Sequence, residues 1–173
     1  MIMILNKLFK LLIDLAFYLM IPILIFFPGT ILYILFFPEQ AIINVNTPFT
    51  ENGFGVKAIL FTIVFFVLFV WFFLGFYQLR KFAGQLLKQK LFSKEVIKST
   101  QKAGRFFIAC GLGSFIFIAI TSILTNEDRI SITFGTSNLS LLLFLLIVGV
   151  LFLLLSDAFK KALFLKKEND LTV

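Results

Sequence analysis

The sequence predicts an all-α membrane protein: a bundle of four transmembrane helices in a single membrane domain, residues 1–173. Hydrophobic residues make up 60% of the chain and charged residues 14%, which is a more apolar composition than soluble domains have. The hydrocarbon core of a bilayer is about 30 Å thick, so a helix that crosses it needs about 20 apolar residues. Four windows reach that length and define the expected spans: residues 11–37, 58–78, 106–124 and 139–159.

The first window is the longest, and it contains Pro22 and Pro28 before it ends at Pro38. Each interior proline removes one backbone hydrogen bond, so we expect this helix to be tilted or kinked. Lys7 and Lys10 precede the window, as basic residues precede the apolar part of a signal peptide. However, the run is too long for a signal peptide and no small-residue cleavage pattern follows it, so we expect a retained span.

The connection between the second and third spans, residues 79–105, is expected to form a helical hairpin. Apolar residues recur there at helical spacing among basic ones: Leu79, Phe82, Leu86 and Leu87. The second helix should therefore run past the membrane surface. A break is expected near residues 90–92, and Ser93 is the predicted N-cap of the next helix, with Glu95 in its first turn.

The uneven distribution of basic residues sets the predicted orientation. Of the 16 Lys and Arg residues, all but Lys57 and Arg129 fall before the first span, in residues 79–105 or in the tail 160–173. Loops that are rich in Lys and Arg stay on the cytoplasmic side. We therefore expect both termini and the hairpin to lie in the cytoplasm, with the loops 38–57 and 125–138 outside.

Each of the two outer loops contains a candidate for a short strand. Residues 41–46 (Ala-Ile-Ile-Asn-Val-Asn) and 129–134 (Arg-Ile-Ser-Ile-Thr-Phe) carry β-branched residues in near-alternation, and turn formers flank both segments. Pairing the two segments would satisfy backbone groups close to the bilayer. We therefore expect a small extracytoplasmic two-stranded β lid.

The absence of His and the presence of a single Cys exclude several classes of function. Acid–base catalysis by His, Cys/His zinc sites and intrachain disulfides all need residues that the chain lacks. No nucleophile set occurs either, so we expect neither an enzyme nor a cofactor or metal site. Cys110 lies in residues 109–114 (Ala-Cys-Gly-Leu-Gly-Ser), whose small side chains at four-residue spacing predict close helix packing.

Three ionisable residues lie at the predicted cytoplasmic ends of the spans: Asp14, Arg80 and Asp157. An ionisable group at membrane depth marks a candidate functional site, and these three would form one polar cluster in the mouth of the bundle. The alternative is local pairing along each helix. Lys10 lies four residues before Asp14, and Lys160 and Lys161 follow Asp157 at three and four residues.

Three short motifs occur together in this chain: Leu-Arg-Lys at 79–81, Lys-Leu-Phe-Ser at 90–93, and the ending Lys-Glu-Asn-Asp-Leu-Thr-Val at 167–173. With four spans in this order, the chain resembles, over essentially its whole length, a bacterial family catalogued as domain of unknown function 2975. The acidic tail, residues 168–172, is the most specific part of the likeness. The resemblance implies a bacterial inner-membrane protein that is commonly encoded beside a small Cro-type helix-turn-helix regulator, and it supplies no catalytic residues.

We therefore expect an interaction or regulatory subunit that binds a small cytoplasmic DNA-binding regulator. The candidate docking residues lie in the hairpin and the tail: Lys88, Lys90, Lys94, Lys98, Glu168, Asp170 and Leu171. Alternatively, the basic residues anchor the helix ends at membrane lipids, and the tail is a solvated end. A small oligomeric transporter or channel subunit is a further alternative, which the nearly continuous apolar spans disfavour. We expect no direct binding of nucleic acid, and a homo-oligomer stays open.

Overall fold

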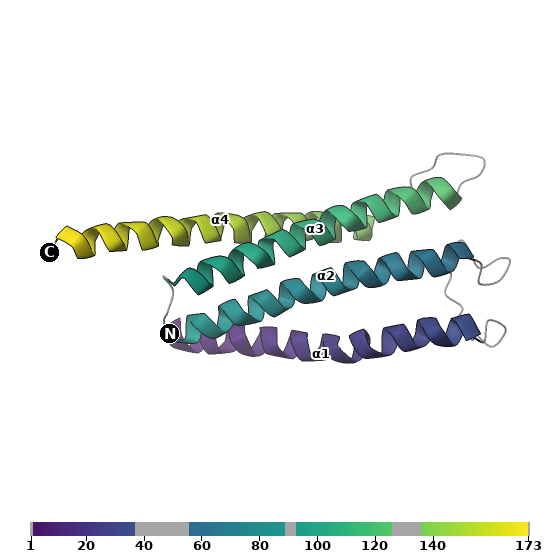
Figure 1. Cartoon of the computed structure of the whole chain (residues 1–173), viewed down its shortest axis with the longest axis horizontal. Coiled ribbons are helices and arrows are strands. Elements are labelled where there is room, and N and C mark those ends of the chain that lie inside the picture. The colour runs from purple at the N-terminus through teal and green to yellow at the C-terminus, as the bar shows by residue number, and fades with distance from the viewer. Residues whose placement is uncertain (1, 37–55, 89–92, 126–135, 173) are drawn as a thin grey trace.

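The protein consists of long α-helices throughout the described part of the chain, which comprises residues 2–36, 56–88, 93–125 and 136–172 of a computed structural model (Figure 1). The helices are α1 (Ile2–Phe36), α2 (Val56–Leu87), α3 (Lys94–Thr125) and α4 (Thr136–Thr172). Each of them is long and apolar enough to cross a membrane. The all-helical prediction with four spans is therefore confirmed for these residues.

The helices are longer than the apolar windows from which they were predicted. They contain 35, 32, 32 and 37 residues, and at 1.5 Å per residue even a 32-residue helix measures about 48 Å. A hydrocarbon core of about 30 Å cannot cover that length. Each helix is therefore longer than the hydrocarbon core, and α4 remains helical to Thr172, through most of the segment expected to be a tail.

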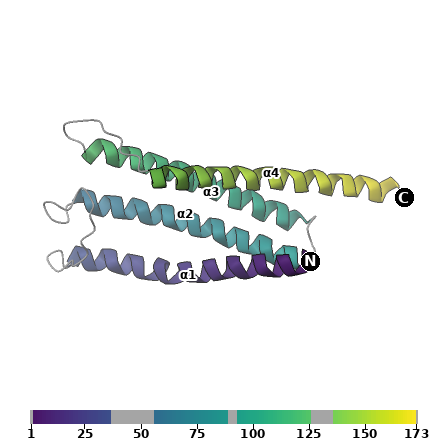
Figure 2. The same cartoon turned by 180° about the vertical axis from the view of Figure 1, so that it is seen from behind.

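The helices pack in chain order, as a row. Among the described residues, backbone contacts join α1 to α2, α2 to α3 and α3 to α4, and they join no other pair (Figures 1 and 2). α1 and α4 therefore form the two edges of the row. This corrects the expected bundle, because a closed bundle would also bring α1 against α4.

The core of the row consists of aromatic side chains around Phe107 of α3. The Phe107 ring is only 2% exposed and stands edge-on to Phe72 and Phe76 of α2, with ring centroids 5.9 and 5.8 Å apart. On its other side it stacks on Phe152 of α4 at 5.9 Å. Offset and edge-to-face rings attract one another beyond their hydrophobic burial, so Phe107 joins the three helices.

The backbones of α3 and α4 approach each other closely at two glycines. A Cβ atom added to Gly104 would lie 2.7 Å from the carbonyl oxygen of Gly149, and one added to Gly149 would lie 3.0 Å from the carbonyl oxygen of Gly104. Small residues let helix backbones meet in a membrane, where apolar burial alone does not drive association. Nearby, the buried Ser156 hydroxyl donates a hydrogen bond of 3.0 Å to the carbonyl of Ile97.

The small residues predicted to pack closely, 109–114, contact both neighbouring helices. A Cβ atom on Gly113 would lie 2.5 Å from Leu68 of α2, and one on Gly111 would lie 3.0 Å from Leu146 of α4. Close packing is confirmed at these two positions. The glycine contact between α3 and α4 lies further toward the start of α3 than the sequence pattern indicated.

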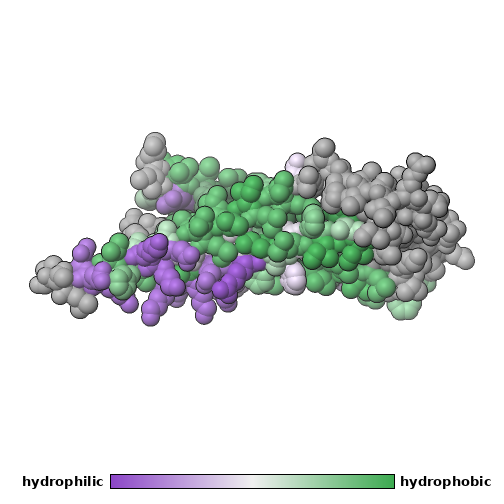
Figure 3. Space-filling model, turned by 90° about the horizontal axis from the view of Figure 1, so that it is seen from above, coloured by the Kyte–Doolittle hydropathy of each residue, from purple (hydrophilic) through white to green (hydrophobic). Residues whose placement is uncertain are grey.

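One end of the molecule contains the start of α1, the end of α2, the start of α3 and the end of α4 (Figures 1 and 2). We call it the polar end. Hydrophilic residues gather toward this end, and hydrophobic residues cover the middle of the molecule (Figure 3). The backbone N–H of Val96 donates to the Ser93 hydroxyl at 3.2 Å. This bond confirms Ser93 as the N-cap of α3.

The expected two-stranded β lid falls on segments 41–46 and 129–134, and both segments lie outside the described residues. Within the ranges that the structure describes, the chain contains helices and no strand. The lid therefore has no structural support and stays a prediction.

Candidate functional site at the polar end of the row

The first feature of the polar end is an ion pair between α1 and α2. The Nε of Arg80 donates to Oδ1 of Asp14 at 2.8 Å, and the two side chains are 33% and 25% exposed. The Nη2 of Arg80 also donates to the hydroxyl of Tyr18 at 2.8 Å. Asp14 and Tyr18 lie four residues apart and so share one face of α1. That face receives the guanidinium.

Aromatic rings hold the same guanidinium from the side. The Cζ atom of Arg80 lies 4.9 Å from the ring centroids of both Phe17 and Tyr18, within the range of a cation–π interaction. Phe17 is 7% exposed and stacks on Phe73 of α2 at 4.7 Å. These contacts hold the Arg80 side chain of α2 against α1, so Arg80 and its partners join the two helices.

The structure brings two of the three predicted cluster residues together. Asp14 and Arg80 form the pair above, whereas Asp157 is exposed on α4, whose backbone neighbour is α3. The row of helices explains the separation, since α1 and α4 lie at opposite edges. Within the described residues, Asp14 pairs with Arg80, which lies 66 residues away in the chain, and not with the local neighbour Lys10.

The second feature is a cleft of about 400 Å³ between the last turns of α2 and the first turns of α3. We call it the basic cleft, and its lining residues are Gln78, Lys81, Gln85, Glu95, Lys98, Ser99 and Lys102. Three lysines face a single carboxylate there. Sequence reasoning missed this cleft, although Lys94, Lys98 and Lys102 recur at four-residue spacing and so mark one helix face.

Gln85 and Glu95 connect the two walls of the basic cleft. The Nε2 of Gln85 donates to Oε2 of Glu95 at 2.8 Å. The other amide atom, Oε1, is buried and has no hydrogen-bond partner in the described part of the protein. Nearby, the ammonium of Lys81 lies 5.1 Å from the ring centroid of Tyr77, which orients that cation along α2.

The third feature is the end of α4, which projects beyond the other helices (Figures 1 and 2). We call the stretch from Lys160 to Thr172 the α4 extension. Its apolar side chains Phe164 and Leu165 are 62% and 60% exposed. Basic residues surround them in the sequence: Lys160, Lys161, Lys166 and Lys167.

The predicted docking residues fall on two parts of this end. Lys88, Lys94 and Lys98 are exposed around the connection between α2 and α3, and Lys98 also lines the basic cleft. Glu168 is exposed on the α4 extension. Lys90 lies outside the described residues, and Asp170 and Leu171 are described only as part of the α4 backbone.

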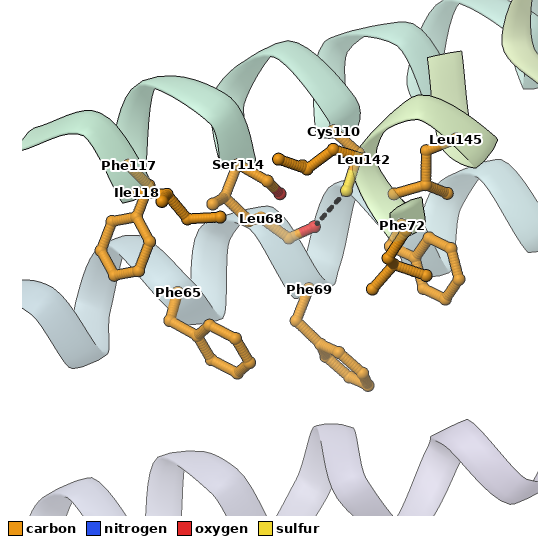
Figure 4. Close-up of a pocket in the computed structure, with 11 residues that line it drawn as sticks. Phe65, Leu68, Phe69, Phe72, Cys110, Ser114, Phe117, Ile118, Leu142 and Leu145 are labelled. Carbon is orange, nitrogen blue, oxygen red and sulfur yellow. Dashed lines mark hydrogen bonds between the residues drawn. The ribbon is translucent and has the colours of Figure 1, made fainter. Parts of the chain in front are cut away.

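An apolar cavity of about 360 Å³ lies away from the polar end, between α2, α3 and α4 (Figure 4). Phe65, Phe69 and Phe72 line it from α2, and leucines line it from α4. The Cys110 thiol donates to the carbonyl of Leu68 at 3.6 Å. The cavity contains no charged lining residue, so its surface suits hydrocarbon.

Metal binding has no support in the described ranges. They contain no group of three or more His, Cys, Asp or Glu residues that could hold an ion.

The fold and the polar end together define a multi-pass α-helical membrane protein whose charged residues gather at one end of its helices. Residues 16–173 match the family described as "Protein of unknown function (DUF2975)", so the chain belongs to that family. The match confirms the resemblance that the sequence features indicated. No curated protein and no solved structure matches the chain.

Proposed function

We propose that this protein is a docking protein of the bacterial inner membrane that holds a small DNA-binding regulator at the cytoplasmic surface. The α4 extension is the observation that carries the proposal. It projects beyond the other helices (Figure 1) and exposes Phe164 and Leu165. Burying one such side chain is worth about 1.5–3 kcal/mol, so a partner with an apolar groove gains from covering them.

The orientation of the polar end supports a cytoplasmic partner. Fourteen of the 16 basic residues lie before the first span, in residues 79–105 or after residue 159, and these segments meet at the polar end. Basic segments are retained in the cytoplasm during insertion. The polar end therefore faces the compartment in which transcription regulators act.

The carboxylates at the end of the α4 extension, beyond its four lysines, fit the chemistry of such a partner. Glu168 and Asp170 follow the exposed apolar pair in the sequence, and a DNA-binding regulator is basic on its DNA-contacting face. An amphipathic helix that enters a partner's groove is a common mode of peptide recognition. The extension would bind the regulator by its apolar residues and compete with DNA for its basic face through the carboxylates.

One deletion and one double substitution test this function. The tagged full-length chain is purified from native membranes in mild detergent, and the recovered soluble proteins are assayed for DNA binding. We expect a DNA-binding protein whose recovery falls when Glu168–Val173 are deleted and falls further for Phe164→Ser with Leu165→Ser. The electrostatic part should weaken with salt, since exposed charges are screened within about 10 Å at 0.1 M.

A matched control is available on α1. Ile4 and Leu5 are also apolar, also near the polar end, and 73% and 64% exposed, so Ile4→Ser with Leu5→Ser changes the same chemistry outside the extension. This control should retain the regulator. The proposal is wrong if the truncated chain and the full chain recover the same amount, or if neither recovers a DNA-binding protein.

A further inference from the structure

The basic cleft has the composition of an anion site. Lys81, Lys98 and Lys102 line it together with one carboxylate, Glu95, so its fixed charges leave an excess of positive charge. Its volume of about 400 Å³ lies in the range of small-molecule sites, roughly 300–1,000 Å³. Three lysines around one cavity favour an anionic ligand such as a phosphate ester, whose charged oxygens accept strong hydrogen bonds from ammonium groups.

The side-chain oxygen of Gln85 favours a ligand that carries a hydrogen-bond donor. Its Nε2 is committed to the Glu95 carboxylate at 2.8 Å, and turning the amide over would place two acceptor oxygens against each other. The buried Oε1, which has no partner in the described residues, is therefore left as an acceptor for a further donor. Burying an amide oxygen without a donor costs about 1–3 kcal/mol. A ligand hydroxyl beside the phosphate would supply the missing donor.

The place of the cleft in the fold indicates the source of such a group. Its residues, 78–102, run from the end of the apolar window 58–78 to just before the window 106–124, where we expect the surface of the bilayer. Basic pockets between helices at the cytoplasmic surface bind anionic headgroups. A glycerol headgroup on a phosphodiester combines one negative charge with neighbouring hydroxyls.

We propose that the basic cleft binds a phosphate ester that carries a neighbouring hydroxyl, as the headgroup of phosphatidylglycerol does. Lys81, Lys98 and Lys102 surround the phosphate, and Gln85 accepts a hydrogen bond from the hydroxyl. The site lies between α2 and α3, so an occupied cleft joins the two helices of the hairpin. The inference goes beyond the docking function and does not depend on a soluble partner.

Lipid retention by the purified chain tests the charge requirement. The full-length protein in detergent is mixed with equal amounts of phosphatidylglycerol and phosphatidylcholine, and bound lipid is measured by native mass spectrometry. We expect at least tenfold enrichment of phosphatidylglycerol. The triple variant Lys81→Gln, Lys98→Gln, Lys102→Gln should lose this enrichment, whereas the control Lys160→Gln, Lys161→Gln, Lys166→Gln removes equal charge from the α4 extension and should keep it.

A second comparison tests the hydroxyl requirement. Phosphatidylmethanol carries the same charge as phosphatidylglycerol but no headgroup hydroxyl. The unmodified protein should prefer phosphatidylglycerol several-fold, and Gln85→Met, which replaces the amide by an apolar group of similar length, should bind the two lipids equally. Circular dichroism of each variant shows whether the helices are intact, so loss of binding is separated from loss of folding.

A soluble competitor distinguishes the two sources of the ligand. Displacement of phosphatidylglycerol by millimolar glycerol 3-phosphate would assign the cleft to a soluble phosphate ester, and retention of the lipid would assign it to the membrane. Equal enrichment by the triple variant and its control would overturn the proposal, because general attraction of basic residues to anionic lipid would then explain the binding. Failure to bind either phosphate ester would overturn it as well.

Discussion

Arg80 shows how one residue positions a whole helix. Among the α1 side chains that the structure describes, Ile13 and Phe17 are the buried ones, so much of this helix faces away from the protein. The guanidinium contacts Asp14, Tyr18 and the Phe17 ring at once. Because both side chains are partly buried, removing one partner leaves the other charge without its ion pair.

A double-mutant cycle measures this coupling. We expect Asp14→Leu and Arg80→Leu each to lower the free energy of unfolding. The double variant should lose about 1 kcal/mol less than the sum of the two single losses. The value is modest because a quarter to a third of each side chain is exposed and exposed pairs are screened. Unfolding in mixed micelles of increasing SDS content gives the free energies, and additive effects would show that the pair is not coupled.

The sequence placed Asp14 and Arg80 at the same end of their helices but left the partner of Asp14 open. Lys10 was the local alternative, because side chains four residues apart are neighbours on a helix. The tertiary pair formed instead, with Tyr18 as a second acceptor for the guanidinium. The four-residue spacing of Asp14 and Tyr18 indicates that both side chains lie on one face of α1, where both can accept hydrogen bonds from Arg80. Asp157 was misplaced because the sequence does not indicate which helices are neighbours.

At the scale of the elements, the contact between α3 and α4 depends on glycines, whose lack of a side chain lets the two backbones approach. Gly104 and Gly149 bring the two backbones together, and the rings of Phe107 and Phe152 stack beside them. Ser156 adds a hydrogen bond to the backbone of α3. The chain therefore uses one of its few polar intramembrane side chains to join helices.

A pair of glycine substitutions separates packing from helix propensity. Gly104→Ala puts a Cβ atom 2.7 Å from the Gly149 oxygen, so we expect it to destabilise the protein by about 1–3 kcal/mol, the usual cost of overpacking. Gly84→Ala meets no atom within 4 Å and should be neutral or stabilising by up to about 1 kcal/mol, since Ala is the better helix former. The same SDS unfolding assay compares them, and equal effects would contradict the proposed contact.

The extents of the helices show what hydropathy can and cannot predict. The four windows located every span, but α1 begins before its window and α2 continues to Leu87. The reason is that Lys, Glu and Gln form helices well although they end an apolar window. Hydropathy therefore located the membrane segments but not the ends of the helices.

At the scale of the whole molecule, the row of helices was not predictable from the sequence. Helices such as α2 and α4 are apolar on nearly all sides in their spans, so no hydrophobic stripe indicates which face meets a neighbour. The polar end, by contrast, follows from the positions of Lys and Arg along the chain. The basic cleft required the structure, because its walls come from two helices.

Both proposals depend on the polar end facing the cytoplasm, and cysteine labelling tests this orientation most directly. In a Cys110→Ala background, single cysteines are placed at Asn52, in the loop between α1 and α2, and at Lys94, at the start of α3. Intact cells are treated with a thiol reagent that does not cross the membrane. The account predicts that Asn52→Cys reacts and that Lys94→Cys reacts only after the cells are opened. Labelling of Lys94→Cys but not Asn52→Cys in intact cells would contradict it.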